Sequence, residues 1–198
     1  MNRIKLFEDF DVNQINSIYD LTSKLKEYSV PISTWGTGYA KTIENLYDEL
    51  KEDECILVDE GGYLVRYIEF VGIRVLYKDR DNQTWVLKED RQEFTDGRVR
   101  RRTMPSSVSE KMKFGEDSLV AAIRGIKEEL SVKIEAHQLR KHRPLYYTGG
   151  SQSYPGLKAK YKGHQYVCYL EEHQFKKGGY VEFQKDKHTF FKWQKRVD

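Results

Sequence analysis

The stretch from residue 115 to 132, GEDSLVAAIRGIKEELSV, constrains the fold of this chain more than any other. Its apolar residues recur at intervals of three and four, as they do on one buried face of a helix: Leu119, Ala122, Ile123, Ile126 and Leu130. Asp117 or Ser118 can cap the amino terminus, because a short polar side chain accepts a hydrogen bond from a free backbone N–H there. The sequence therefore predicts an amphipathic helix over 117–130 that other elements must cover.

Polar residues occupy the rest of this helix. At roughly 100° per residue, Glu128 falls opposite the apolar face and Glu129 to one side, with Gly125 on the arc between them. Arg124 lies one turn before Glu128. Such carboxylates suit a hard divalent cation, whereas the ordinary alternative is a solvated helix face. Gly125 costs about 1 kcal/mol relative to alanine in a helix, so a close phosphate or a packed backbone would explain it, and so would drift.

The register of these residues resembles the Nudix box, which reads Gly, five residues, Glu, seven residues, then Arg-Glu-apolar-x-Glu-Glu-x-Gly-apolar. The matching positions are Glu116, Arg124, Ile126, Glu128, Glu129 and Val132. Three positions depart from it: Glu110 replaces the opening Gly, Ser131 the closing Gly, and Gly125 the Glu after the Arg. The resemblance implies an α/β fold, a Nudix-like α/β/α sandwich with a mixed curved sheet and an amino-terminal helical extension.

The same resemblance implies a pyrophosphohydrolase acting on a nucleoside diphosphate linked or similar phosphorylated compound. Its Mg²⁺ (or Mn²⁺) would be held by Glu116, Glu128 and Glu129, and Arg124, Glu128 and Glu129 would be the catalytic residues. In the family, the Glu that is missing at Gly125 is a metal ligand and sometimes the general base. The alternative is therefore a catalytically impaired protein that binds a phosphorylated ligand, RNA or a protein partner.

Two other segments supply candidate substrate contacts. Arg100 and Arg102 lie on a basic strand that leads into the box, where guanidinium groups suit phosphate; a basic edge strand that discourages pairing is the alternative. Tyr154, Lys158 and Lys160 lie in a long segment, 142–165, rich in Gly, Ser and Tyr. They could stack a base and neutralise phosphates, or the loop could pack its own aromatics. Binding of single-stranded RNA there would depend steeply on salt.

The rest of the chain predicts helices followed by strands. Two amphipathic helices are expected at 12–28 and 40–51, before a change of texture at Cys55. Strands are then expected at 55–59, 63–70, 71–77, 84–90, 132–136, 165–170 and 189–193, with a hairpin turn at Asp96-Gly97. We therefore divide the chain into a helical extension at 1–54, packed on the domain, and a Nudix-like domain at 55–198.

Composition limits the class of protein. The charged fraction is 33%, the hydrophobic fraction 38% and the formal net charge +3, which indicates a globular chain that is neither disordered nor embedded in a membrane. No apolar run approaches the roughly 18 residues of a membrane span, and the first residues lack the apolar core of a signal peptide. A cytoplasmic location without a membrane partner is expected, and the oligomeric state is left open.

Overall fold

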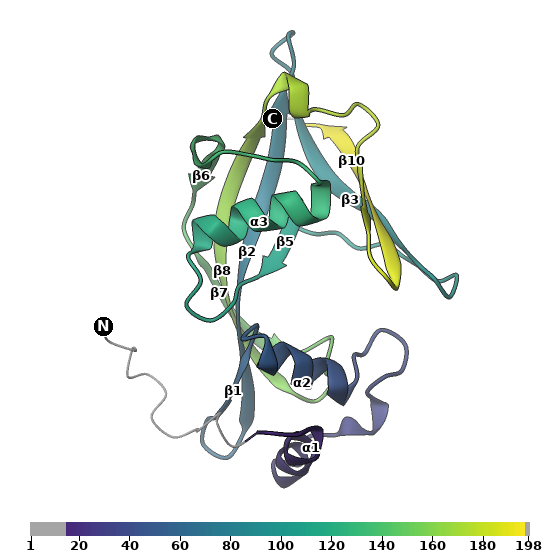
Figure 1. The fold of residues 1–198 in the computed structure, drawn as a ribbon, viewed down its shortest axis with the longest axis vertical. Helices are drawn as coiled ribbons and strands as arrows, with labels where there is room; N and C mark the ends of the chain where they lie inside the picture. Colours follow the sequence, from purple (N-terminus) through teal and green to yellow (C-terminus); the bar gives the residue numbers. More distant parts are fainter. Residues whose placement is uncertain (1–14, 197–198) are drawn as a thin grey trace. The chain divides into compact units, whose positions relative to one another are not determined.

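A computed structural model describes residues 15–196 of the chain (Figure 1). Its contacts divide the chain into two compact units. The first contains residues up to 69, 112–115 and 145–162, and the second contains 70–111, 116–144 and the residues from 163 onward. Strands β2 (Leu64–Lys78) and β8 (Lys158–Leu170) contribute residues to both.

The second unit is built on a sheet. Its remaining strands are β3 (Thr84–Phe94), β4 (Val99–Arg100), β5 (Val108–Lys111), β6 (Leu139–Lys141), β9 (Tyr180–Phe183) and β10 (Lys187–Lys195). The strand order is β6-β8-β2-β3-β10-β9, with β4 beside β3 and β5 beside β2. β8 and β2 run in the same direction in Figure 1, whereas β3 is antiparallel to both β2 and β10. The expected α/β class with a mixed, curved sheet is confirmed.

Helix α3 (Ser118–Leu130) packs against β5 and β9 in this unit. The Asp117 carboxylate accepts hydrogen bonds from the Leu119 and Val120 N–H groups at 2.8 and 3.2 Å. The buried side of the helix includes Ala122, Ile126 and Leu130. The predicted helix at 117–130 and its aspartate cap are therefore confirmed.

The first unit contains α1 (Ile18–Glu27), α2 (Ile43–Lys51), β1 (Ile56–Asp59), β7 (Leu145–Gly150) and a short 3-10 turn, η2 (Ile32–Thr34). β1 pairs with β2 and β7 pairs with β8. Its core includes leucines from both helices and the loop residues Tyr154 and Leu157. Both helices begin later than predicted, because Ser17 and Thr42 accept hydrogen bonds as their amino-terminal caps. Positions 12–14 of the first predicted helix lie outside the described residues.

Three predictions about the strands are wrong. The two strands expected at 63–70 and 71–77 are one continuous strand, β2. The segment 142–165 was expected to be a long loop, but it contains β7 and the beginning of β8. The many glycines and tyrosines of this segment are typical of a loop, and its strands are formed by pairing with each other and with strands far away in the sequence. Residues 132–136 are not a strand: Val132 and Ile134 are buried, but the chain there is irregular and enters a 3-10 turn, η3 (Ala136–Gln138). The alternation of apolar residues there reflects burial of Val132 and Ile134 without pairing to another strand.

The boundary at residue 54 between a helical extension and a Nudix-like domain stays a prediction.

None of the helices described between residues 15 and 196 is long and apolar enough to cross a membrane.

Candidate functional site

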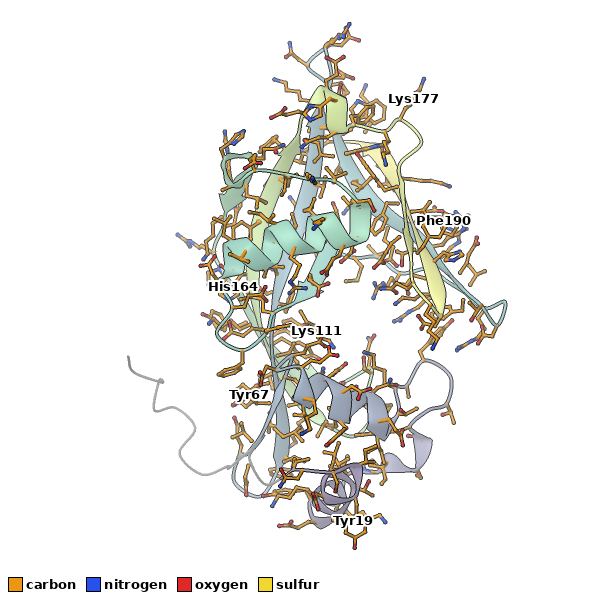
Figure 2. The ribbon with its side chains drawn as sticks, in the orientation of Figure 1. Tyr19, Tyr67, Lys111, His164, Lys177 and Phe190 are labelled. Carbon is orange, nitrogen blue, oxygen red and sulfur yellow. The ribbon has the colours of Figure 1, made fainter. Side chains whose placement is uncertain are left out.

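Arg124 lies at the centre of an ion-pair network on α3. Its guanidinium donates to both Glu116 carboxylate oxygens at 3.2 and 3.0 Å, to Glu110 at 2.9 Å and to Glu128 at 3.2 Å. It also donates to the backbone carbonyl of Lys111 at 2.9 Å; Figure 2 labels Lys111, the last residue of β5. These carboxylates raise the pKa of Arg124. Arg124 thus fixes the helix to β5 and to the segment before the helix, and two of the three predicted metal ligands, Glu116 and Glu128, are bonded to it.

Glu129 belongs to a second group of carboxylates. The Ser109 N–H donates to one of its oxygens at 3.2 Å. Burial raises the pKa of Glu129 well above its usual value, and the carboxylates of Glu182, Glu110 and Glu89 raise it further. We call Glu89, Glu110, Glu129 and Glu182 the Glu129 cluster; its members come from β3, β5, α3 and β9. Burial and Glu89 also raise the pKa of Glu182.

Two arginines offset part of this negative charge. Arg102 donates to both oxygens of Glu89 at 2.8 Å each, and the Glu89 side chain is only 5% exposed. The negative charges of Glu129 and Glu182, which lie farther away, also raise the pKa of Arg102. Glu110 has its own cation in Arg124. Among the described residues, neither Glu129 nor Glu182 forms an ion pair with an arginine or lysine. The charge of Lys187 lowers the pKa of Glu182, but burial outweighs it, and the pKa values of Glu129 and Glu182 both stay raised.

The side chain of Glu110 fills the space that Gly125 leaves open. A Cβ atom built on Gly125 would lie 2.9 Å from the Cβ of Glu110, 3.3 Å from its Cγ and 3.5 Å from Val108. This spacing requires a glycine in the helix, and close packing explains it better than drift does. Two of the three departures from the Nudix-like register therefore meet in the structure: the Glu110 side chain of β5 packs against the position of α3 at which the box has a Glu.

The other predicted substrate contacts lie in different surroundings. Arg100 is on β4 and pairs in register with Gln92. Lys158 lies 3.1 Å from the ring centre of Tyr63, and Lys160 donates to the Glu60 carboxylate, both in the first unit. Tyr154 is fully buried in the core of that unit. A ligand base could stack on Tyr154 only if this core opened, so Tyr154 is not part of the proposed site.

The predictions missed three members of the Glu129 cluster: Glu89, Glu110 and Glu182. Glu110 had a sequence signal, because it occupies the position of the opening Gly of the box. Glu89 and Glu182 had none, since strand pairing alone brings β3 and β9 towards the helix. In the arrangement seen, no three acidic, His or Cys side chains between residues 15 and 196 converge closely enough to hold a metal ion. The donor chemistry suits a hard cation, but the carboxylates would have to draw closer together to bind one.

No protein-family model and no curated protein matches the sequence. Among solved structures, the chain is similar to an Ap4A hydrolase from C. elegans, with 18% identity and a TM-score of 0.38 over 65% of this chain and 80% of that one. It is also similar to a MutT/nudix family protein from Enterococcus faecalis, with 13% identity and a TM-score of 0.43 over 88% and 55% of the respective chains. A dihydroneopterin triphosphate pyrophosphohydrolase from E. coli has 19% identity and a TM-score of 0.39 over 63% and 78%.

With TM-scores below 0.5 these likenesses carry no argument, and the function proposed for the chain rests on the contacts around α3.

Proposed function

We propose that the protein is a Nudix-like pyrophosphohydrolase that acts on a nucleoside diphosphate linked or similar phosphorylated compound with Mg²⁺ or Mn²⁺. The observation that carries the proposal is the fit of Glu110 into the space above Gly125. Because this fit keeps a carboxylate beside the helix, the loss of the box Glu at position 125 does not by itself remove the acidic site.

The residues divide into two roles in this proposal. Glu129, Glu182 and Glu110 would hold the cation, which would neutralise phosphate charge and orient the attacking water. Excess negative charge and a raised carboxyl pKa are the conditions that a divalent cation relieves. Glu116 and Glu128 position Arg124. Both of them, and Glu110 as well, accept hydrogen bonds from Arg124, so each would reach a cation only by releasing the guanidinium. Arg102 lies beside the cluster through Glu89 and is the candidate phosphate contact.

A second function remains open, in which the protein binds a phosphorylated ligand, RNA or a partner without hydrolysing it. The separation of the carboxylates in the described structure favours this alternative. The two functions differ in turnover, so one assay distinguishes them.

The first experiment measures hydrolysis by the purified protein with Mg²⁺ or Mn²⁺. The substrates are nucleoside diphosphate derivatives, dinucleoside polyphosphates and capped RNA. We expect turnover by the unchanged protein and its loss in Glu129→Gln, a change of nearly equal volume. Glu52→Gln is the matched control, because Glu52 is an exposed residue at the end of α2, in the other unit. Turnover that is equal in both variants would show that the Glu129 cluster is not the active site.

The second experiment exchanges the two unusual positions. Glu110→Gly alone removes a carboxylate, and Gly125→Glu alone forces a new side chain against Glu110. Each single variant should therefore lose turnover. The double variant, Glu110→Gly with Gly125→Glu, returns both residue types to the usual positions and should recover it. A double variant that binds Mg²⁺ but shows no turnover would favour the binding function.

A further inference from the structure

The sheet of the second unit has two distinct faces. Val108 of β5 lies 3.5 Å from the Cβ position of Gly125, and it pairs in register with Ile73 of β2, so Ile73 faces α3. The hydroxyl of Tyr166 on β8 is 2.8 Å from that of Ser118, at the start of α3. Because side chains alternate along a strand, Arg74 and Gln165 lie on the face away from α3, and so does Gly72.

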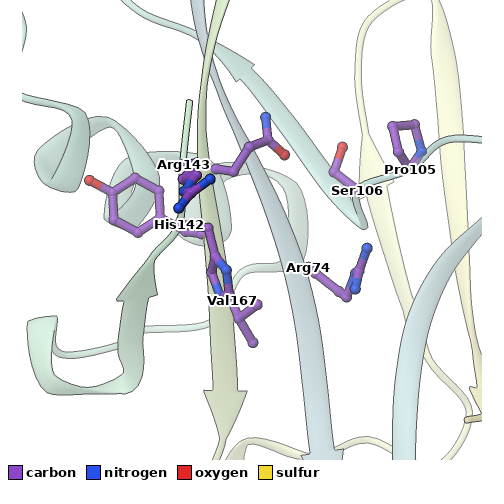
Figure 3. Close-up of a pocket in the computed structure, with 8 residues that line it drawn as sticks. Arg74, Pro105, Ser106, His142, Arg143 and Val167 are labelled. Carbon is purple, nitrogen blue, oxygen red and sulfur yellow. The ribbon is translucent and has the colours of Figure 1, made fainter. Parts of the chain in front are cut away.

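A cavity of about 490 Å³ opens on that other face. Figure 3 shows it bordered by Arg74, by Pro105 and Ser106 before β5, and by His142 and Arg143 after β6. Its size lies within the range of roughly 300–1,000 Å³ that is common for small-molecule sites. The cavity shares no residue with the Glu129 cluster. It is therefore a separate candidate site.

The charge of this cavity has one sign. Two guanidinium groups line it, and none of its lining residues is acidic. Within residues 15–196, neither Arg74 nor Arg143 forms an ion pair, which contrasts with Arg91, Arg102 and Arg124, each bonded to a glutamate. An arginine without a carboxylate partner can form a bidentate pair of hydrogen bonds with an anion.

The neutral side chain of Gln165 also lines the cavity, where it packs over the backbone of Gly72. The Gln165 amide lies over Gly72, where an added Cβ would be 2.9 Å from its nitrogen and 3.0 Å from its oxygen. The His142 N–H donates to the Gln165 carbonyl at 2.8 Å, which connects the end of β6 to β8. Gly72 thus makes room for a side chain whose amide can donate to an oxygen-rich ligand.

We propose that this cavity binds the phosphate groups of a small ligand, through the guanidinium groups of Arg74 and Arg143 with the Gln165 amide as a further donor. The ligand is either inorganic pyrophosphate or a nucleotide bearing the same diphosphate. The site does not depend on the proposed hydrolase, because no member of the Glu129 cluster lines it.

The test is calorimetric titration in EDTA, with pyrophosphate, ADP and adenosine as ligands. Arg74→Gln with Arg143→Gln should weaken diphosphate binding at least roughly tenfold, since charge-assisted hydrogen bonds contribute the most among polar contacts. Arg140→Gln is the matched control: Arg140 is an exposed arginine on β6 that lies over the Tyr169 ring and outside the cavity. Circular dichroism of each variant verifies the fold.

Each outcome decides the matter. Binding of pyrophosphate and ADP with equal affinity, lost in the double variant only, assigns the site to diphosphate itself. ADP binding more tightly than pyrophosphate, with adenosine inactive, assigns it to a nucleotide. An equal loss in Arg140→Gln would show general attraction to a basic surface and would overturn the proposal, as would tight binding of adenosine or no binding of any ligand. Retention in Glu129→Gln is also expected; its loss would move the ligand to the Glu129 cluster and refute the cavity.

Discussion

At the scale of single residues, the charge of Glu129 is the least favourable feature of the acidic site. Burial and three nearby carboxylates raise the pKa of Glu129. Arg102 interacts with Glu129 electrostatically without forming an ion pair with it. A raised carboxyl pKa means that the folded protein binds this proton more tightly than the unfolded chain does. The ionised group therefore lowers stability above the folded pKa, and the penalty disappears below the ordinary value of 4.5.

Glu129→Gln should accordingly raise the free energy of unfolding at pH 8, by roughly 0.5 to 3 kcal/mol, the usual size of single-substitution effects. The gain should shrink as the pH falls and vanish below about pH 4, because the carboxyl is then protonated in both states. Urea unfolding at several pH values measures it. A gain that does not change with pH would mean that packing, and not charge, determines the effect.

At the scale of elements, the end of α3 carries a strained residue. Ser131 ends the helix with φ 54, in the left-handed region, and its N–H donates to the Lys127 carbonyl. A side chain is disfavoured in this conformation, and glycine adopts it freely. Ser131→Gly should raise the free energy of unfolding by about 1 kcal/mol, measured by thermal or urea unfolding. Lys133→Gly is the control and should not stabilise the protein, because Lys133, two residues further on, does not have a positive φ.

The contact between α3 and β5 makes a second prediction at this scale. In most helices a change from glycine to alanine stabilises by up to about 1 kcal/mol. Gly125→Ala should instead destabilise, because its methyl group would lie 2.9 Å from the Glu110 Cβ. In a Glu110→Gly background the same change should stabilise. A double-mutant cycle by urea unfolding measures this reversal, and the same sign in both backgrounds would contradict the tight packing.

At the scale of the whole molecule, the first unit has a charged pair in its core. The first unit contains a buried ion pair in which Arg66 of β2 donates to Glu49 of α2, with both side chains nearly inaccessible. Tyr154 packs its ring against this pair and against Trp35. The attraction within a buried ion pair adds little net stability, because it mostly offsets the cost of desolvating the two charges. Removing one partner is costly, because the other charge then stays buried without a counterion.

Glu49→Gln should therefore lower the stability of the first unit by roughly 3 to 5 kcal/mol. We expect hydrogen exchange to accelerate in the amides of α1, α2 and β1, while those of α3 keep their protection, because the second unit has its own core. Equal loss of protection in α3 would show that the two units unfold together. Glu44→Gln, on the exposed side of α2, is the matched control for a lost helix charge.

The sequence by itself determined the features that short-range periodicity encodes. The apolar spacing from Leu119 to Leu130 and the aspartate cap defined α3, and the strand-rich second half established the α/β class. Tertiary structure alone decided which carboxylates meet. Glu89 and Glu182 approach Glu129 because strands far apart in the chain pair with each other. The spacing of residues within a short segment does not predict such pairing. The same cause turned Tyr154 from a candidate ligand contact into core, and it made Glu110 the partner of Gly125.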